Sequence, residues 1–265
     1  MFPGRDPRRA AEPRKFRRGL VLLPSLITVG NLFCGYACIV HAMQGELLTA
    51  APFIGVAVIL DMLDGRIARL TGTTSAFGLE FDSLADMVSF GLAPAVLAFA
   101  WGLNGLGKAG WAAGFVYVAA TAMRLARFNI QSPGQGDKRY FVGMPSPAAA
   151  GVPAATVFLL ADPTFRFASM VANPAFRSWS AAIVMIVPGL LMVSTIRFRS
   201  FKTIDPGWQR SYVGLLLFIL LIAFITTEPA TTLVILSYGY LFSAFIGMAI
   251  TRLKSRTPPR AAIES

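Results

Sequence analysis

Eight apolar runs dominate this sequence, and each has the length of about 20 residues that a helix needs to cross a bilayer. The chain of 265 residues is 55% hydrophobic and only 14% charged. Because a membrane interior offers no hydrogen bonds to an exposed backbone, such runs are expected to be helical. We therefore predict an all-α integral membrane protein with about eight transmembrane helices. The runs are expected at about 20–43, 48–70, 78–102, 110–129, 145–162, 178–196, 211–227 and 230–252.

Positive charge gives the predicted helices an orientation. Basic residues gather in the N-terminal tail, in alternate connections and in the C-terminal tail, as the positive-inside rule requires of a protein with both termini in the cytoplasm. The net charge of +11 would suggest nucleic acid in a soluble protein, but no basic stripe lies on a soluble face, so we expect no nucleic-acid partner. Anionic membrane lipids are the expected partners of these charges.

The same pattern predicts three parts and a location. Residues 1–18 form a basic cytoplasmic tail, residues 19–253 a membrane domain that carries an aspartate-rich motif at 61–86, and residues 254–265 a second basic tail. The first tail is either disordered or lies on anionic lipid through residues 14–18. The expected location is the inner (cytoplasmic) membrane of the cell, with multiple passes and with the motif at the cytoplasmic side.

Four aspartates interrupt the second and third apolar runs. Asp61 and Asp64 are three residues apart, and Asp82 and Asp86 are four apart, so each pair lies on one face of a helix. Two helices joined by a short loop can therefore bring four carboxylates together. So many anions in a place of low dielectric require a cation, and divalent metal ions are the simplest candidates.

Three interpretations of the aspartates remain open from the residues alone. They hold divalent metals that bind a phosphate-containing substrate, they form a cation path in an ion-coupled transporter, or they pair with Arg66 and Arg69 as structural ions. Transporter sites tend to lie near the bilayer midplane within repeated halves, whereas these acids lie near one surface and the halves do not resemble each other. Arginines beside a metal site favour a diphosphate ligand.

The spacing of the motif resembles a known family. It reads Asp-x2-Asp-Gly-x2-Ala-Arg-x8-Gly-x3-Asp-x3-Asp, which resembles the signature of CDP-alcohol phosphatidyltransferases. The fixed positions are Asp61, Asp64, Gly65, Ala68, Arg69, Gly78, Asp82 and Asp86. The resemblance implies a membrane enzyme with a six-helix core, here with two further C-terminal helices, and a homodimer.

The resemblance also implies roles for these residues. Two divalent ions, Mg²⁺ or Mn²⁺, would be bound by the aspartates, and Asp86 would in addition be the general base that activates the attacking hydroxyl. The implied metal ligands are Asp61, Asp64, Asp82 and Asp86. The implied CDP-binding residues are Gly65, Ala68, Arg69 and Gly78. Displacement of CMP from a CDP-linked lipid by an alcohol is the implied reaction.

Three further stretches resemble the phosphatidylserine synthase branch of this family. They are residues 24–35, 124–129 and 141–150. In the first, Thr28 and Asn31 share one helical face, where they either help to bind the nucleotide or pack helices together. The resemblance implies CDP-diacylglycerol and serine as substrates. Other acceptors that the family uses remain alternatives: glycerol 3-phosphate, choline or an inositol phosphate.

A serine acceptor would explain two arginines at the end of the fourth run. Serine carries a carboxylate, which an arginine can bind through two parallel hydrogen bonds. Arg124 and Arg127 are three residues apart and are the predicted serine-binding residues. The alternative is that both are ordinary positive charges at a cytoplasmic helix end.

Overall fold

The structure is a computed structural model that describes residues 14–71, 75–130, 140–163, 172–199 and 212–255. Residues 1–13 and 256–265, which form most of the two predicted tails, lie outside these ranges. Within them the chain is almost entirely helical, as the apolar runs predict. The helices are α1 (Arg14–Met43), α2 (Leu47–Thr71), α3 (Ala76–Asp86), α4 (Ala93–Trp101), α5 (Lys108–Ile130), α6 (Ser146–Leu160), α8 (Pro174–Val193), α9 (Tyr212–Thr227) and α10 (Pro229–Ser255).

Helical segments stand at all eight predicted positions, and the all-α membrane class is confirmed. Four are long and apolar enough to cross a bilayer: Ser25–Met43, Leu47–Ile67, Ala76–Trp101 and Pro174–Val193. By contrast, α6 has 15 residues and rises only about 22 Å at 1.5 Å per residue. The number of spans therefore stays a prediction.

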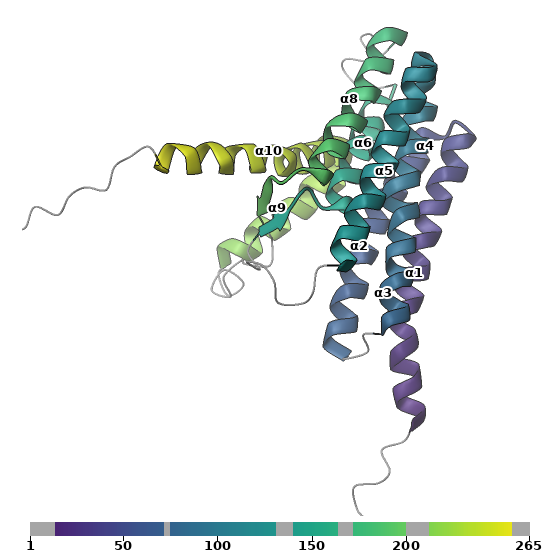
Figure 1. The fold of residues 1–265 in the computed structure, drawn as a ribbon, viewed down its shortest axis with the longest axis vertical. Helices are drawn as coiled ribbons and strands as arrows, with labels where there is room; N and C mark the ends of the chain where they lie inside the picture. The colour runs from purple at the N-terminus through teal and green to yellow at the C-terminus, as the bar shows by residue number, and fades with distance from the viewer. Residues whose placement is uncertain (1–13, 72–74, 131–139, 164–171, 200–211, 256–265) are drawn as a thin grey trace, which may run out of the picture.

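The helices before α9 form an elongated bundle, whereas the last two leave it. In Figure 1 α1 to α6 and α8 run along the long axis, and α10 lies crosswise to them. The middle of α10 still packs on α6, where the Thr156 and Tyr238 hydroxyls are 2.8 Å apart. The two C-terminal helices thus differ in direction from the helices before them, and the six-helix core stays a prediction.

The third predicted run is one continuous helical segment with an irregular middle. A π-helical stretch, η2 (Met87–Leu92), joins α3 to α4 directly after Asp86, and the linking residues Met87 and Ala93 are helical. The start of α3 is fixed by Ser75, whose hydroxyl accepts a 3.0 Å hydrogen bond from the backbone N–H of Gly78. A π-helical turn inside a helix is frequently associated with functional sites.

Small side chains allow α1 and α2 to pack closely. Cys38, Ala42, Ala50 and Ala57 are all buried where these helices meet other core residues. Gly45 forms the tight turn between the two helices at φ +82°, a conformation that favours glycine. This close hairpin places the polar residues of α1 beside the acidic end of α2.

A short two-stranded sheet, which the hydropathy pattern does not predict, joins two connections. Strand β1 (Tyr140–Val142) pairs antiparallel with β2 (Arg197–Arg199), and Phe141 lies opposite Phe198. Beyond the strand, the backbone N–H of Gly143 donates to the Ile196 carbonyl at 2.8 Å. These bonds fix the chain that leads into α6 and its first residue, Ser146.

Candidate functional site

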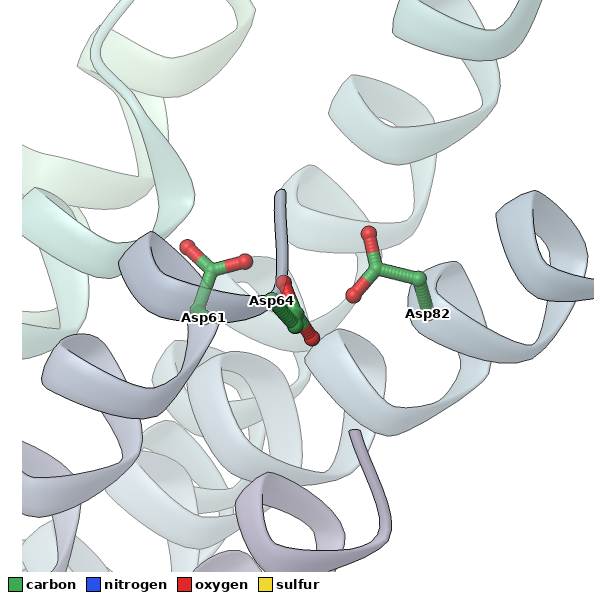
Figure 2. Close-up of side chains that lie close together, drawn as sticks. All are labelled: Asp61, Asp64 and Asp82. Atoms are coloured by element: carbon green, nitrogen blue, oxygen red, sulfur yellow. The ribbon is translucent and has the colours of Figure 1, made fainter. Parts of the chain in front are cut away.

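Three of the four predicted aspartates converge at one point. Carboxylate oxygens of Asp61 and Asp64 on α2 and of Asp82 on α3 lie within 4.8 Å of one another. Figure 2 shows the side chains directed toward a common region, with Asp64 between the other two. Asp64 is buried, and Asp61 and Asp82 are half-buried. The helical spacing in the sequence therefore produces the expected acidic cluster.

The fourth aspartate stands beside this group but is not a member of it. Asp86 is buried, and its Oδ1 accepts a 3.1 Å hydrogen bond from Nδ2 of Asn31. Asn31 lies on α1, and Asp64 has a similar partner there, because the Thr28 hydroxyl of α1 donates to Oδ2 of Asp64 at 3.0 Å. Both side chains of α1 that were predicted to bind the nucleotide therefore contact carboxylates.

The acidic cluster fits divalent cations. Among the described residues, no lysine, arginine or histidine nitrogen lies within 4.0 Å of the four carboxylates. Oδ1 of Asp82 is buried and has no hydrogen-bond partner among those residues. Buried carboxylates without a counter-charge are costly, and oxygen donors of this kind are what Mg²⁺ and Mn²⁺ prefer. The cluster can thus bind metal, and the identity of the ions is open.

The structural ion-pair interpretation finds no support in this geometry. Arg66 and Arg69 are both exposed, and neither forms an ion pair with an aspartate in the described structure. The Arg69 guanidinium instead lies over Gly65, where an added Cβ would be 3.4 Å from Nη1. A side chain at position 65 would therefore contact this guanidinium, next to Asp64.

Two other residues of the motif are placed less fully. Gly78 is half-buried in the first turn of α3, where its N–H bonds to Ser75. Ala68 lies on α2, but its side chain is outside the described part of the structure. The predicted roles of both in binding CDP stay predictions.

The two predicted serine-binding arginines occupy different environments. The Arg124 side chain is largely enclosed and interacts electrostatically with Asp86 and Asp61. Its Nη1 donates a 2.8 Å hydrogen bond to the hydroxyl of Ser146, and its Nε is buried without a hydrogen-bond partner in the described region. Arg127 is exposed. Arg124 thus lies at the acidic site, and Arg127 faces outward.

Sequence reasoning missed two contacts that complete this side of the site. Ser146 was not predicted as a site residue, although it stands in a Pro-Ser-Pro sequence that begins α6. The amide of Asn129 donates to the Ser83 hydroxyl at 3.0 Å and so joins α5 to α3. A polar residue between two prolines at a helix start is the signal that could have identified Ser146.

The fold and the site together define a helical membrane protein that presents a carboxylate cluster suited to metals and to a phosphate-bearing substrate. A comparison with known families agrees with this class. The family model described as CDP-alcohol phosphatidyltransferase matches residues 21–187, and the chain belongs to this family. The protein is therefore a transferase of the membrane. The matched region contains most of α1, the helices α2 to α6 and most of α8, whereas α9 and α10 lie beyond it.

Curated relatives extend over most of the chain. A Helicobacter pylori protein named CDP-diacylglycerol–serine O-phosphatidyltransferase is 36% identical over 241 residues, which are 90% of this chain and 98% of that protein. A Bacillus subtilis protein with the same name is 34% identical over 68% of this chain and 91% of its own length. An archaetidylserine synthase of Methanothermobacter thermautotrophicus is 32% identical over 67% and 70% of the respective chains.

Proposed function

We propose that this chain transfers the phosphatidyl group of CDP-diacylglycerol to the hydroxyl of L-serine, with phosphatidylserine and CMP as products. The names of the similar proteins support both substrates. The observation that carries the choice of serine is the enclosed guanidinium of Arg124, which has an unpartnered Nε beside the acidic site. A partly buried guanidinium with an unpartnered donor is suited to the carboxylate that serine has and glycerol lacks.

Asp61, Asp64 and Asp82 are the residues that would hold two divalent ions, Mg²⁺ or Mn²⁺, and Asp86 lies next to them. When bound, the ions would neutralise the diphosphate and stabilise the charge on the CMP oxygen as it leaves. Arg69 adds a guanidinium on the same side, beside Gly65. With Ala68 and Gly78, these two residues line the proposed CDP pocket.

The chemical step is a single displacement at phosphorus. The serine hydroxyl oxygen forms a bond to the phosphorus that carries diacylglycerol, and the bond from this phosphorus to the CMP oxygen breaks. Asp86 accepts the hydroxyl proton as general base, because an alcohol is a poor nucleophile until that proton is removed. The electron pair of the broken bond leaves with CMP. Arg124 holds the serine carboxylate and so directs its hydroxyl toward Asp86.

The proposal places the reaction at the cytoplasmic side of the inner membrane. The basic connections support an orientation with both termini in the cytoplasm, so serine enters from the cytosol and the lipid from the adjacent leaflet. A homodimer is part of the proposal on the family resemblance. The apparent mass of the protein in detergent, corrected for bound detergent, tests the dimer directly.

One assay tests the function. The purified protein in detergent is incubated with CDP-diacylglycerol, Mg²⁺ or Mn²⁺, and one acceptor at a time: serine, glycerol 3-phosphate, choline or an inositol phosphate. We expect CMP release with serine alone. Release with another acceptor in place of serine would transfer the proposal to that alcohol, and no release with any would refute the assigned reaction.

A further inference from the structure

Two polar residues of α1 reach both halves of the acidic motif. Thr28 and Asn31 are three residues apart, on one face of α1, and both are buried. The Thr28 hydroxyl donates to Asp64, which lies on α2 in the first half of the motif. The Asn31 amide donates to Asp86, which lies at the end of α3 in the second half. A single helical turn of α1 thus contacts one carboxylate from each half.

This turn of α1 is itself fixed in place. The Ser89 hydroxyl of η2 donates a 2.8 Å hydrogen bond to the backbone carbonyl of Asn31. One turn further, Gly35 allows the backbones of α1 and η2 to approach closely at Ser89. The π-helical stretch that begins directly after Asp86 is therefore bound to the same turn of α1 that contacts Asp86.

The two hydrogen bonds have different consequences for the two carboxylates. A donor on one oxygen fixes the rotation of a carboxylate, and Asp64 is one of the three residues whose oxygens converge. Asp86 is outside that group, and its Oδ1 is taken up by Asn31. The assigned orientation of the Asn31 amide directs its nitrogen at Asp86, because the amide oxygen would repel an ionised carboxylate. One donor thus fixes a carboxylate inside the converging group, and the other fixes the carboxylate that lies outside it.

We propose that Thr28 and Asn31 are positioning residues that divide the four aspartates between two tasks. Thr28 orients Asp64 as a ligand of the metal cluster, and Asn31 retains Asp86 beside the cluster as the base that accepts the serine proton. This inference rests on the proposed function. It differs from a nucleotide-binding role for the two side chains, because their donor groups are directed at carboxylates.

The two roles predict separate effects. Groups that orient a metal ligand typically change metal affinity or activity by about 10- to 100-fold when they are removed. Loss of the Thr28 hydroxyl is expected to weaken metal binding, because Asp64 loses its orientation. Loss of the Asn31 amide is expected to lower kcat while metal affinity is retained, because Asp86 alone loses its partner. Neither change is expected to alter the KM for CDP-diacylglycerol by more than about twofold.

The experiment uses matched variants of the full chain in detergent. Thr28→Val removes the hydroxyl at nearly constant shape, and Thr28→Ser retains it. Asn31→Leu removes the amide at similar volume. Mn²⁺ affinity is measured by electron paramagnetic resonance on the protein alone, kcat and KM at saturating Mn²⁺, and folding by the melting temperature. The metal measurement needs no turnover, so the readout does not depend on activity.

The proposal expects Thr28→Val to bind Mn²⁺ at least about tenfold more weakly, Thr28→Ser to resemble the wild type, and Asn31→Leu to lose about tenfold or more in kcat with normal Mn²⁺ affinity. A raised KM for CDP-diacylglycerol with kcat and Mn²⁺ affinity unchanged would overturn it in favour of nucleotide contacts. Mn²⁺ affinity, kcat and KM unchanged in all variants would overturn the proposal and show that both residues serve only helix packing. If Asn31→Leu fails to fold, the comparison of Thr28→Val with Thr28→Ser still tests the positioning role of Thr28. A wild-type protein that binds no Mn²⁺ would refute the metal site of the proposed function.

Discussion

Gly35 of α1 lies so close to Ser89 of η2 that a Cβ atom added to Gly35 would be 2.8 Å from the Ser89 Cα atom. Real Cβ atoms essentially never approach another heavy atom within 3.0 Å, and here the obstacle is backbone. The absence of a side chain at Gly35 therefore sets the distance between α1 and the segment that follows Asp86.

Gly35→Ala is accordingly expected to destabilise the protein by roughly 1–3 kcal/mol, the usual range for overpacking a core, and to lower activity because Asn31 and Asp86 move apart. Gly55→Ala on α2 is the matched control, since an added Cβ there meets nothing within 4 Å. Melting temperature and CMP release measure the two effects. Equal stability of the two variants would contradict the close approach of α1 to η2.

The helices were largely predictable because membrane length and hydropathy act locally. The run expected at 78–102 is observed as Ala76–Trp101, and the one at 145–162 contains α6 (Ser146–Leu160). The acidic cluster was predictable for a similar reason, because helical spacing places Asp61 and Asp64 on one face.

The contacts that complete the site were not predictable, because they join distant segments. Asn31 and Asp86 are 55 positions apart, and nothing in hydropathy pairs them. The β1–β2 sheet lies in two connections. Each strand, 140–142 and 197–199, has only three residues, which is too short to give a recognisable alternating pattern. Nor did the apolar character of α10 indicate that it lies crosswise to the bundle (Figure 1). Such features depend on tertiary packing.

Removal of divalent metal is expected to abolish turnover reversibly. Excess EDTA should stop CMP release, and added Mg²⁺ or Mn²⁺ should restore it. Without these ions, the converging carboxylates of Asp61, Asp64 and Asp82 would face the diphosphate with no positive charge between them. Asp82→Asn should weaken Mn²⁺ binding in the same resonance measurement. Full activity in EDTA would exclude metal ions from the reaction.

Asp86→Asn is expected to lower kcat by about 10²- to 10⁴-fold, the usual contribution of a general base, while the melting temperature stays near that of the wild type. The asparagine retains the shape of the side chain but cannot accept the proton of serine. Glu80→Gln is the control, because Glu80 is an exposed acid on the same helix. Wild-type kcat in Asp86→Asn would show that another group is the base.

Arg124 provides the sharpest test of the acceptor. Its guanidinium donates to Ser146 and has an Nε without a hydrogen-bond partner among the described residues, so Arg124→Lys should retain the charge but lose the planar set of donors. A hydrogen bond to a charged group contributes about 1.5–3 kcal/mol, so we expect kcat/KM for serine to fall by about 10- to 100-fold.

The effect should be confined to the acceptor. The KM for CDP-diacylglycerol should change little in Arg124→Lys, and the preference for serine over ethanolamine, which has no carboxylate, should shrink. Lys108→Ala removes an exposed cation from the start of the same helix and controls for the loss of positive charge. Arg127→Ala tests the other predicted arginine, whose exposed position favours a smaller effect. If Arg124→Lys left the ratio of serine to ethanolamine unchanged, the carboxylate of serine would have to be bound elsewhere.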